Sequence, residues 1–146
     1  MAAAGPWTIY NEFKATFGLK ALNLNVDSMK VALFQSTSNA GNAALASALY
    51  ATLTNQVANG NGYVTGGVVC APTYSQVAGT ATFDTADASW TASGGSITAR
   101  FAVLYDDTAA NKDLIAFCLL DSAPADVVVT TGNTLTIQIA NVFTLA

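Results

Sequence analysis

From residue 63 onward the chain is a succession of short segments rich in Thr, Val and aromatic residues, divided by Gly, Asp, Ser and Pro. The segments are YVTGGVVCA, TYSQVA, TATFDT, ASWTA, SITARFAVLYDD, DLIAFCLL, DVVVTTG, TLTIQIA and VFTL. β-Branched and aromatic residues at this spacing are typical of strands in all-β sandwiches and barrels. The pattern therefore predicts a mainly β fold with antiparallel strands.

The N-terminal part predicts two short helices and one strand. The stretch WTIYNEFKATFG carries aromatic residues at helical spacing, namely Trp7, Tyr10, Phe13 and Phe17. Pro6 precedes this run and Gly18 follows it, which predicts a helix over residues 7–17. The stretch MKVALF predicts a strand within residues 28–35, and the Ala- and Leu-rich stretch 43–53 favours a second helix.

The sequence ANGNGY marks a turn, because Asn-Gly pairs readily adopt positive φ. No segment of the chain has the composition of a linker. Residues 1–146 are therefore expected to form a single β-sandwich domain, with residues 1–18 as an N-terminal arm and helix.

Charged residues make up only 10% of the chain, against about 25% in an average soluble domain. The longest apolar run, LIAFCLL, is far shorter than the ~20 residues of a membrane span, so no membrane association is expected. Thr, Ser, Asn, Gln, Gly and Ala must replace charge at the surface, and such a surface is easily desolvated against a neighbour. This favours an assembling protein; a monomer with a neutral surface is the alternative.

The net charge of −4 and the scattered cations predict no direct binding to nucleic acid, because phosphate neutralisation needs clustered Lys and Arg. The N-terminus lacks the basic region and long apolar core of a secretory signal, so synthesis in the cytoplasm is expected.

Catalytic patterns are scarce. The chain has no histidine, which excludes Ser-His and Cys-His pairs. The obvious carboxylate pair, Asp106 and Asp107, lies in the loop-like sequence YDDTAANKD, and we interpret it as turn chemistry and solvation. The spacing to Asp113 does not match a helix-loop-helix calcium site. No enzymatic activity, cofactor or metal is therefore expected.

Cys70 and Cys118 each lie in an apolar, strand-like run, and no CxxC spacing is present. Two buried free thiols are the favoured interpretation in a reducing cytoplasm. A disulfide stays possible if the two strands are neighbours.

Arg100 is the only arginine and lies within SITARFAVLYDD, which is apolar on both faces toward its end. This predicts a central strand covered on both sides, with Arg100 partly buried beside an acidic or carbonyl partner. Candidate partners are Asp84, Asp87 and Asp106. Arg100 is expected either to tie neighbouring strands or loops together or to anchor a subunit interface, where arginine is enriched.

The candidate interface residues are Trp7, Tyr10, Phe13, Phe17 and Arg100. The four aromatic residues, Trp7, Tyr10, Phe13 and Phe17, form an aromatic stripe along the predicted helix. Packing of this stripe against the chain's own core is the alternative that we favour.

Four stretches of the chain resemble a family of small structural proteins from tailed bacteriophages and prophages: KVALFQSTSNA, YATLTNQVANGNGYVTGG, WTASGGSITARFAVLYDDT and GNTLTIQIANVFTLA. The resemblance runs from about Trp7 to the C-terminus. It implies a virion component, and first a capsid decoration or cement protein with a β-sandwich of jelly-roll type.

A cement protein binds across the joints of a shell through many weak contacts repeated by symmetry. The partners that the resemblance implies are further copies of the chain, as a homodimer or homotrimer, and the major capsid protein. The implied location is the capsid surface of the virion. Uncharged sheet edges are expected to be open to pairing with a neighbour.

A tail, baseplate or fibre module with a receptor-binding face is the competing assignment. It would use exposed aromatic residues, for which Trp7, Tyr63, Tyr74 and Trp90 are available. Core or interface packing is the account of these four that we prefer. The resemblance carries over no functional residues, because its stretches contain no motif with a mechanism.

Overall fold

The chain folds into antiparallel β-sheets with one α-helix, and the computed structural model describes residues 5–19, 22–123 and 125–146. The prediction of a mainly β, antiparallel, sandwich-like fold is confirmed. The elements are β1 (Thr8–Ile9), α1 (Asn11–Leu19), β2 (Met29–Phe34), the 3-10 turns η1 (Asn39–Gly41) and η2 (Tyr50–Thr52), β3 (Val68–Cys70), β4 (Pro72–Val77), β5 (Thr80–Thr85), β6 (Ala88–Thr91), β7 (Ile97–Ala99), β8 (Phe101–Asp106), β9 (Leu114–Leu119), β10 (Val127–Val129), β11 (Thr134–Ile137) and β12 (Phe143–Leu145).

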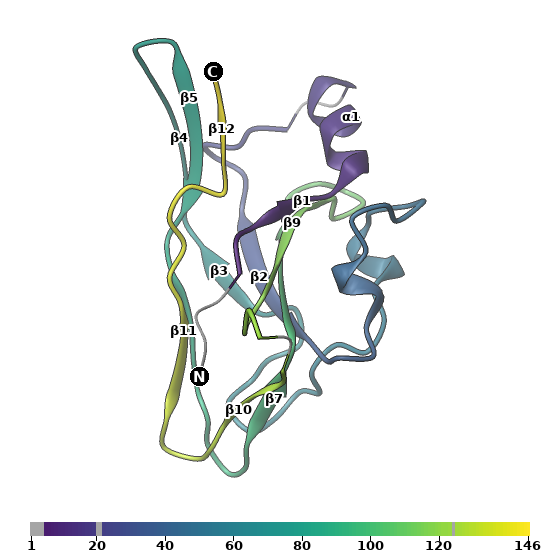
Figure 1. Ribbon diagram of the computed structural model, residues 1–146, viewed down its shortest axis with the longest axis vertical. Helices are drawn as coiled ribbons and strands as arrows, with labels where there is room; N and C mark the ends of the chain where they lie inside the picture. Colours follow the sequence, from purple (N-terminus) through teal and green to yellow (C-terminus); the bar gives the residue numbers. More distant parts are fainter. Residues whose placement is uncertain (1–4, 20–21, 124) are drawn as a thin grey trace.

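The centre of the fold is a five-stranded sheet in the order β1-β9-β8-β2-β3. Its strands β2, β8 and β9 are almost wholly buried, because their sequences are nearly continuous apolar runs. The segment 35–66 lies on one side of this sheet and the strands β4, β5, β11 and β12 lie on the other (Figure 1). The prediction of a central strand covered on both faces is therefore confirmed for residues 101–106, whereas residues 97–99 of the same predicted strand belong to a different sheet.

The second layer is built from small antiparallel pairings: β12-β5-β4, β11-β6 and β10-β7. In β6 and β11 buried and exposed residues alternate, so that Trp90 and Leu135 point inward. On the outer face hydroxyl groups pair across the strands, with 2.9 Å between Ser89 Oγ and Thr136 Oγ1. The uncharged surface expected from the composition is thus a hydroxyl-bearing face, held by cross-strand hydrogen bonds.

The first helix begins later than the sequence pattern predicts. Thr8 and Ile9 pair with Phe117 and Ala116 of β9 and extend the central sheet by a short strand. The helix starts only at Asn11 and ends at Leu19. Thr8 and Ile9, which the helical spacing assigns to the helix, therefore form a strand at the edge of the central sheet instead.

The predicted second helix over residues 43–53 is wrong. The Ala48 N–H donates to the carboxylate of Glu12, and the Ala48 carbonyl accepts the Leu114 N–H at 2.9 Å. The Tyr50 N–H donates to the Lys112 carbonyl at 2.9 Å. These long-range bonds occupy the backbone groups that a helix would use within itself, and tertiary pairing overrides the helix propensity of Ala and Leu. Only the 3-10 turn Tyr50–Thr52 remains.

The turn predicted at ANGNGY is confirmed. Gly60 and Tyr63 exchange two backbone hydrogen bonds of 2.8 Å, and Asn61 and Gly62 between them both have positive φ. In the part of the chain that the structure describes, no helix is both long and apolar enough to cross a bilayer.

The two cysteines are buried free thiols, as favoured from the sequence. Cys70 lies on β3 and Cys118 on β9, with β2 and β8 between them. Three interstrand spacings of about 4.8 Å separate these strands by roughly 14 Å, beyond the ~7 Å between Cα atoms that a disulfide can bridge. Burial raises the pKa of Cys70 to about 11 and that of Cys118 to about 12.

Neither thiol is expected to react with an aromatic disulfide reagent in the native protein at about pH 8. Both are buried, and at that pH roughly a thousandth or less of each is thiolate. Both should react at once in denaturant, as absorbance of the released thiol reports. Fast labelling of either cysteine without denaturant would contradict the placement of that strand.

Candidate interaction surface

The four residues of the aromatic stripe, which are predicted interface residues, differ in their exposure to solvent. Tyr10 and Phe13 are 0% and 3% exposed, and the Tyr10 hydroxyl donates to the Ala40 carbonyl at 2.6 Å. Trp7 is half-buried, whereas Phe17 is 37% exposed. The stripe therefore packs mainly on the chain's own core, and a partner can reach only Trp7 and Phe17.

Arg100 lies at a bend between β7 and β8 rather than inside one strand. Its N–H donates to the Phe34 carbonyl at 2.8 Å, and its carbonyl accepts the Leu120 N–H at 2.9 Å. At this point the chain leaves its pairing with β10 and enters the central sheet between β2 and β9.

The guanidinium of Arg100 pairs with Asp126, at 2.9 Å between Nε and Oδ1. The partners predicted from the sequence, Asp84, Asp87 and Asp106, are therefore wrong. Asp126 stands immediately before β10, and the pairing of β10 with β7 brings it to Arg100. Arg100 thus joins a loop to a strand junction; its side chain is 23% exposed.

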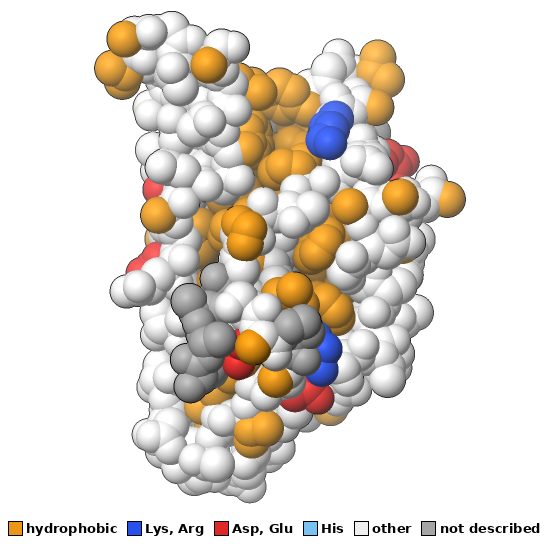
Figure 2. Space-filling model, in the orientation of Figure 1, with side chains coloured by type: hydrophobic (Ala, Val, Ile, Leu, Met, Phe, Trp, Pro, Cys, Tyr) orange, Lys and Arg blue, Asp and Glu red, His pale blue; other side chains and the backbone are white. Residues whose placement is uncertain are grey.

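An apolar groove lies between α1 and the three-stranded sheet β12-β5-β4, where Figure 2 shows hydrophobic side chains gathered in a hollow. One part, of about 440 Å³, is lined by Phe17, Leu22, Asn23, Leu24, Asn25 and Tyr74. The adjoining part, of about 330 Å³, is lined by Ile9, Phe13, Lys14, Phe17, Phe143, Thr144 and Leu145. Phe17 belongs to both.

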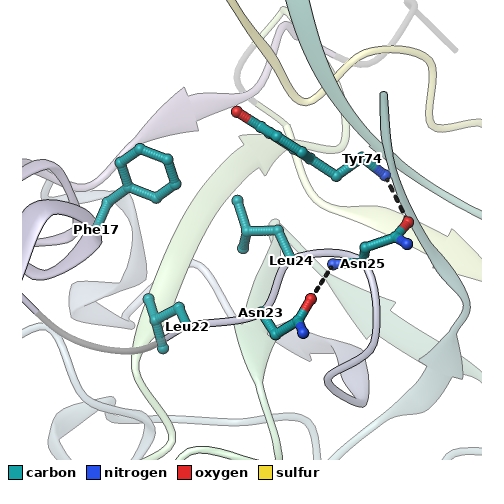
Figure 3. A pocket seen from close by; sticks show the side chains of 6 residues that line it. All are labelled: Phe17, Leu22, Asn23, Leu24, Asn25 and Tyr74. Atoms are coloured by element: carbon teal, nitrogen blue, oxygen red, sulfur yellow. Dashed lines mark hydrogen bonds between the residues drawn. The ribbon is translucent and has the colours of Figure 1, made fainter. Parts of the chain in front are cut away.

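Aromatic rings of α1 and β12 pack against each other in the groove. The ring of Phe143 on β12 lies 5.9 Å from that of Phe13 and 6.3 Å from that of Phe17, centroid to centroid. In the close view, Phe17 and Tyr74 stand on opposite sides of the hollow with Leu24 between them (Figure 3). The sequence pattern does not identify this groove, because β1, α1, the segment 22–25, β4 and β12 meet only in the folded chain.

Uncharged sheet edges are expected to be open to pairing with a neighbouring strand, but the edge of β4 beside the groove is partly blocked. Pro72 has no N–H to donate, and the Tyr74 N–H already donates to Asn25 Oδ1 at 3.1 Å (Figure 3). The side chain of Asn25 thus occupies a position that a neighbouring strand would need.

The carboxylates Asp106 and Asp107 are used in a turn, as interpreted from the sequence. Asp106 Oδ1 accepts the N–H groups of Thr108 at 2.8 Å and Ala109 at 3.0 Å. Asp107 forms ion pairs with Lys30, at 2.9 Å, and with Lys112. Burial would raise the pKa of Asp107, but the hydrogen bonds and charges of the two lysines outweigh it and lower that pKa.

Among residues 5–19, 22–123 and 125–146, no group of three or more Asp, Glu, Cys or His side chains is placed to hold a metal ion. Comparison with protein families, curated proteins and solved structures finds no match for this chain.

Proposed function

We propose that this chain is a structural protein of a bacteriophage virion, and specifically a capsid decoration protein that binds the assembled head shell. The observation that carries the proposal is the mainly apolar groove at one end of the molecule (Figure 2). Lys14 is the only charged side chain among the described residues that line it. The resemblance of four stretches to phage structural proteins supports the same function.

The surface chemistry suits a protein that works by covering joints. Several exposed side chains are large and apolar: Phe17, Leu19, Val26, Val64, Val69, Val77, Val128 and Leu145. Burying apolar surface contributes about 25 cal/mol per Å², and a standard interface buries about 800 Å² on each partner. Contacts of this kind become strong when a symmetric shell repeats them and several copies of the chain, as a dimer or trimer, bind together.

Co-sedimentation tests the proposal. Purified protein is mixed with undecorated heads, with free coat subunits and with isolated tails of the phage that encodes the chain. We expect it to pellet with heads at a fixed number of copies per coat subunit, and to remain in the supernatant with free subunits. Failure to bind heads at any concentration tested would contradict a decoration role.

One observation favours a tail or fibre module as the second candidate. Tyr74, Asn23 and Asn25 line the same part of the groove, and aromatic rings and amide groups are both suited to contacts with sugars. Trp90 and Tyr63, 3% and 1% exposed, are not available for this role. Binding to isolated tails and to host cell-surface glycans, without binding to heads, would favour this candidate.

A further inference from the structure

The junction between the segment 22–28 and the turn 106–109 contains a buried carboxyl group with one unsatisfied oxygen. Asp106 is 0% exposed, and its Oδ1 accepts two backbone N–H groups of the turn. Its Oδ2 is buried and has no hydrogen-bond donor in the described part of the chain. A buried carboxylate oxygen without a donor is strongly unfavourable, so this atom requires an explanation.

A second carboxyl group, that of Asp27, lies close enough to the Asp106 carboxyl group to interact with it. Asp27 Oδ2 accepts the Asn23 N–H at 2.8 Å, which closes the segment 22–28 on itself. Two ionised carboxylates are both acceptors and cannot bond to each other, whereas one proton between them makes a strong hydrogen bond. Burial raises the pKa of Asp106, the two backbone N–H groups offset part of this, and Asp27 raises it further.

The remaining charges around this junction are already engaged. Lys30 on β2 and Lys112 in the loop after β8 both donate to Asp107, so their charges are directed to that carboxylate. The Asp113 carbonyl accepts the Asp106 N–H at 3.0 Å, and the Asp113 side chain has interactions of its own. A proton is therefore the simplest means of satisfying the Asp106 oxygen.

We propose that Asp27 and Asp106 share one proton and that this proton fastens the segment 22–28 to the turn 106–109, as a pH-sensitive latch. Two hydrogen bonds of the Ser28 backbone complete the junction: its N–H donates to Thr108 Oγ1 at 2.7 Å, and its carbonyl accepts the Asp107 N–H at 2.8 Å. The latch is a property of the fold and does not depend on the proposed function.

The latched segment forms one wall of the apolar groove. Leu22 and Leu24 line the groove, and Asn25 caps the Tyr74 N–H at the edge of β4 (Figure 3). Loss of the shared proton leaves two neighbouring negative charges, one on the buried Asp106 and one on the half-buried Asp27, which repel each other and weaken the attachment of the segment. Raising the pH therefore loosens the groove wall and uncovers the β4 edge.

The sign of the pH effect follows from the raised pKa of Asp106. Between the ordinary aspartate value of about 3.9 and the folded value, the native chain holds a proton that the unfolded chain has lost. Stability from the latch is thus complete at the acid end and is lost as the pH rises through the folded pKa. Asp107, whose pKa is lowered, loses its contribution only below about pH 3.9 and so does not shape this window.

The test compares the wild type with Asp106→Asn and Asp27→Asn between about pH 4 and pH 8. An amide replaces the shared proton permanently, because its N–H₂ donates to the remaining carboxylate while its oxygen still accepts. We expect the wild-type Tm to fall as the pH rises, and both variants to lose this slope and melt higher than the wild type at about pH 8. Asp126→Asn, outside the junction, should keep the wild-type slope.

Hydrogen exchange of the Tyr74 amide provides a local measurement. After correction for the intrinsic rate, we expect its protection in the wild type to fall by up to about tenfold per pH unit between about pH 3.9 and the folded pKa of Asp106, to level off above that pKa, and to stay constant in Asp106→Asn. If Tm depends on pH equally in the wild type and in both amide variants, the proposed latch is wrong. It is also wrong if millimolar Ca²⁺ stabilises the wild type but neither variant, because the pair would then hold a metal ion.

Discussion

Gly67→Ala is expected to abolish folding of the chain. Gly67 precedes β3 with φ +80°, and a Cβ atom at this position would lie 1.8 Å from the carbonyl oxygen of Val31 and 2.8 Å from Ala32 Cα. Both neighbours are backbone atoms of β2, which is buried in the centre of the main sheet and cannot move aside. We expect a loss of about 4 kcal/mol or more, comparable with the whole stability of a small domain.

Gly79→Ala is the matched control. Gly79 also has positive φ, at +87°, but no atom lies within 4 Å of the position of its added Cβ. Only the backbone penalty applies, so we expect a loss of about 1 kcal/mol. Urea unfolding monitored by tryptophan fluorescence measures both variants. If the Gly67→Ala protein folds and is as stable as the Gly79→Ala protein, the close contact between Gly67 and the backbone of β2 is wrong.

Phe13→Ala and Phe17→Ala are expected to separate folding from binding. Phe13 is buried against Phe17 and Phe143, so its truncation should reduce the free energy of unfolding by about 3 kcal/mol. Phe17 lies one turn later, is 37% exposed and lines both parts of the groove. Its truncation should reduce stability by about 1 kcal/mol and weaken binding to heads at least tenfold.

Val128→Ser is the control for the binding measurement. Val128 is 56% exposed on β10, at the end of the molecule opposite α1 (Figure 1). We expect this variant to bind heads as the wild type does in the co-sedimentation assay. If Val128→Ser impairs binding and Phe17→Ala does not, the contact surface lies at the other end of the molecule and the groove has a different role.

Sequence patterns predict the strands of this fold well, because most of them carry their signal locally. The segment TATFDT is β5 without any shift, since turn residues stand on both sides of it. The stretch SITARFAVLYDD correctly predicts a buried central strand, but not its interruption at Arg100. The interruption arises because residues 97–99 pair with β10 and residues 101–106 with β2 and β9, a change of partner that no local pattern records.

The failures concern pairings between distant residues. The stretch 43–53 has good helix propensity, yet its backbone bonds go to Glu12, Lys112 and Leu114. Arg100 pairs with Asp126 because β10 docks on β7, which the spacing of charges cannot reveal. The groove joins five segments in the same way, and of its lining residues only the aromatic residues Phe13, Phe17 and Tyr74 attract attention in the sequence. Leu22 and Leu24 have no signal beyond a short alternation with asparagine.

The central claim is that this chain acts by covering a neighbour with its uncharged surface, and electron cryo-microscopy of the intact virion tests it most directly. The account predicts density that fits this fold on the outside of the head shell, repeated at symmetry axes, with the groove between α1 and β12 closed by a coat subunit or another copy of the chain. A virion map in which the fold occurs nowhere, or occurs with the groove fully exposed to solvent, would contradict the account.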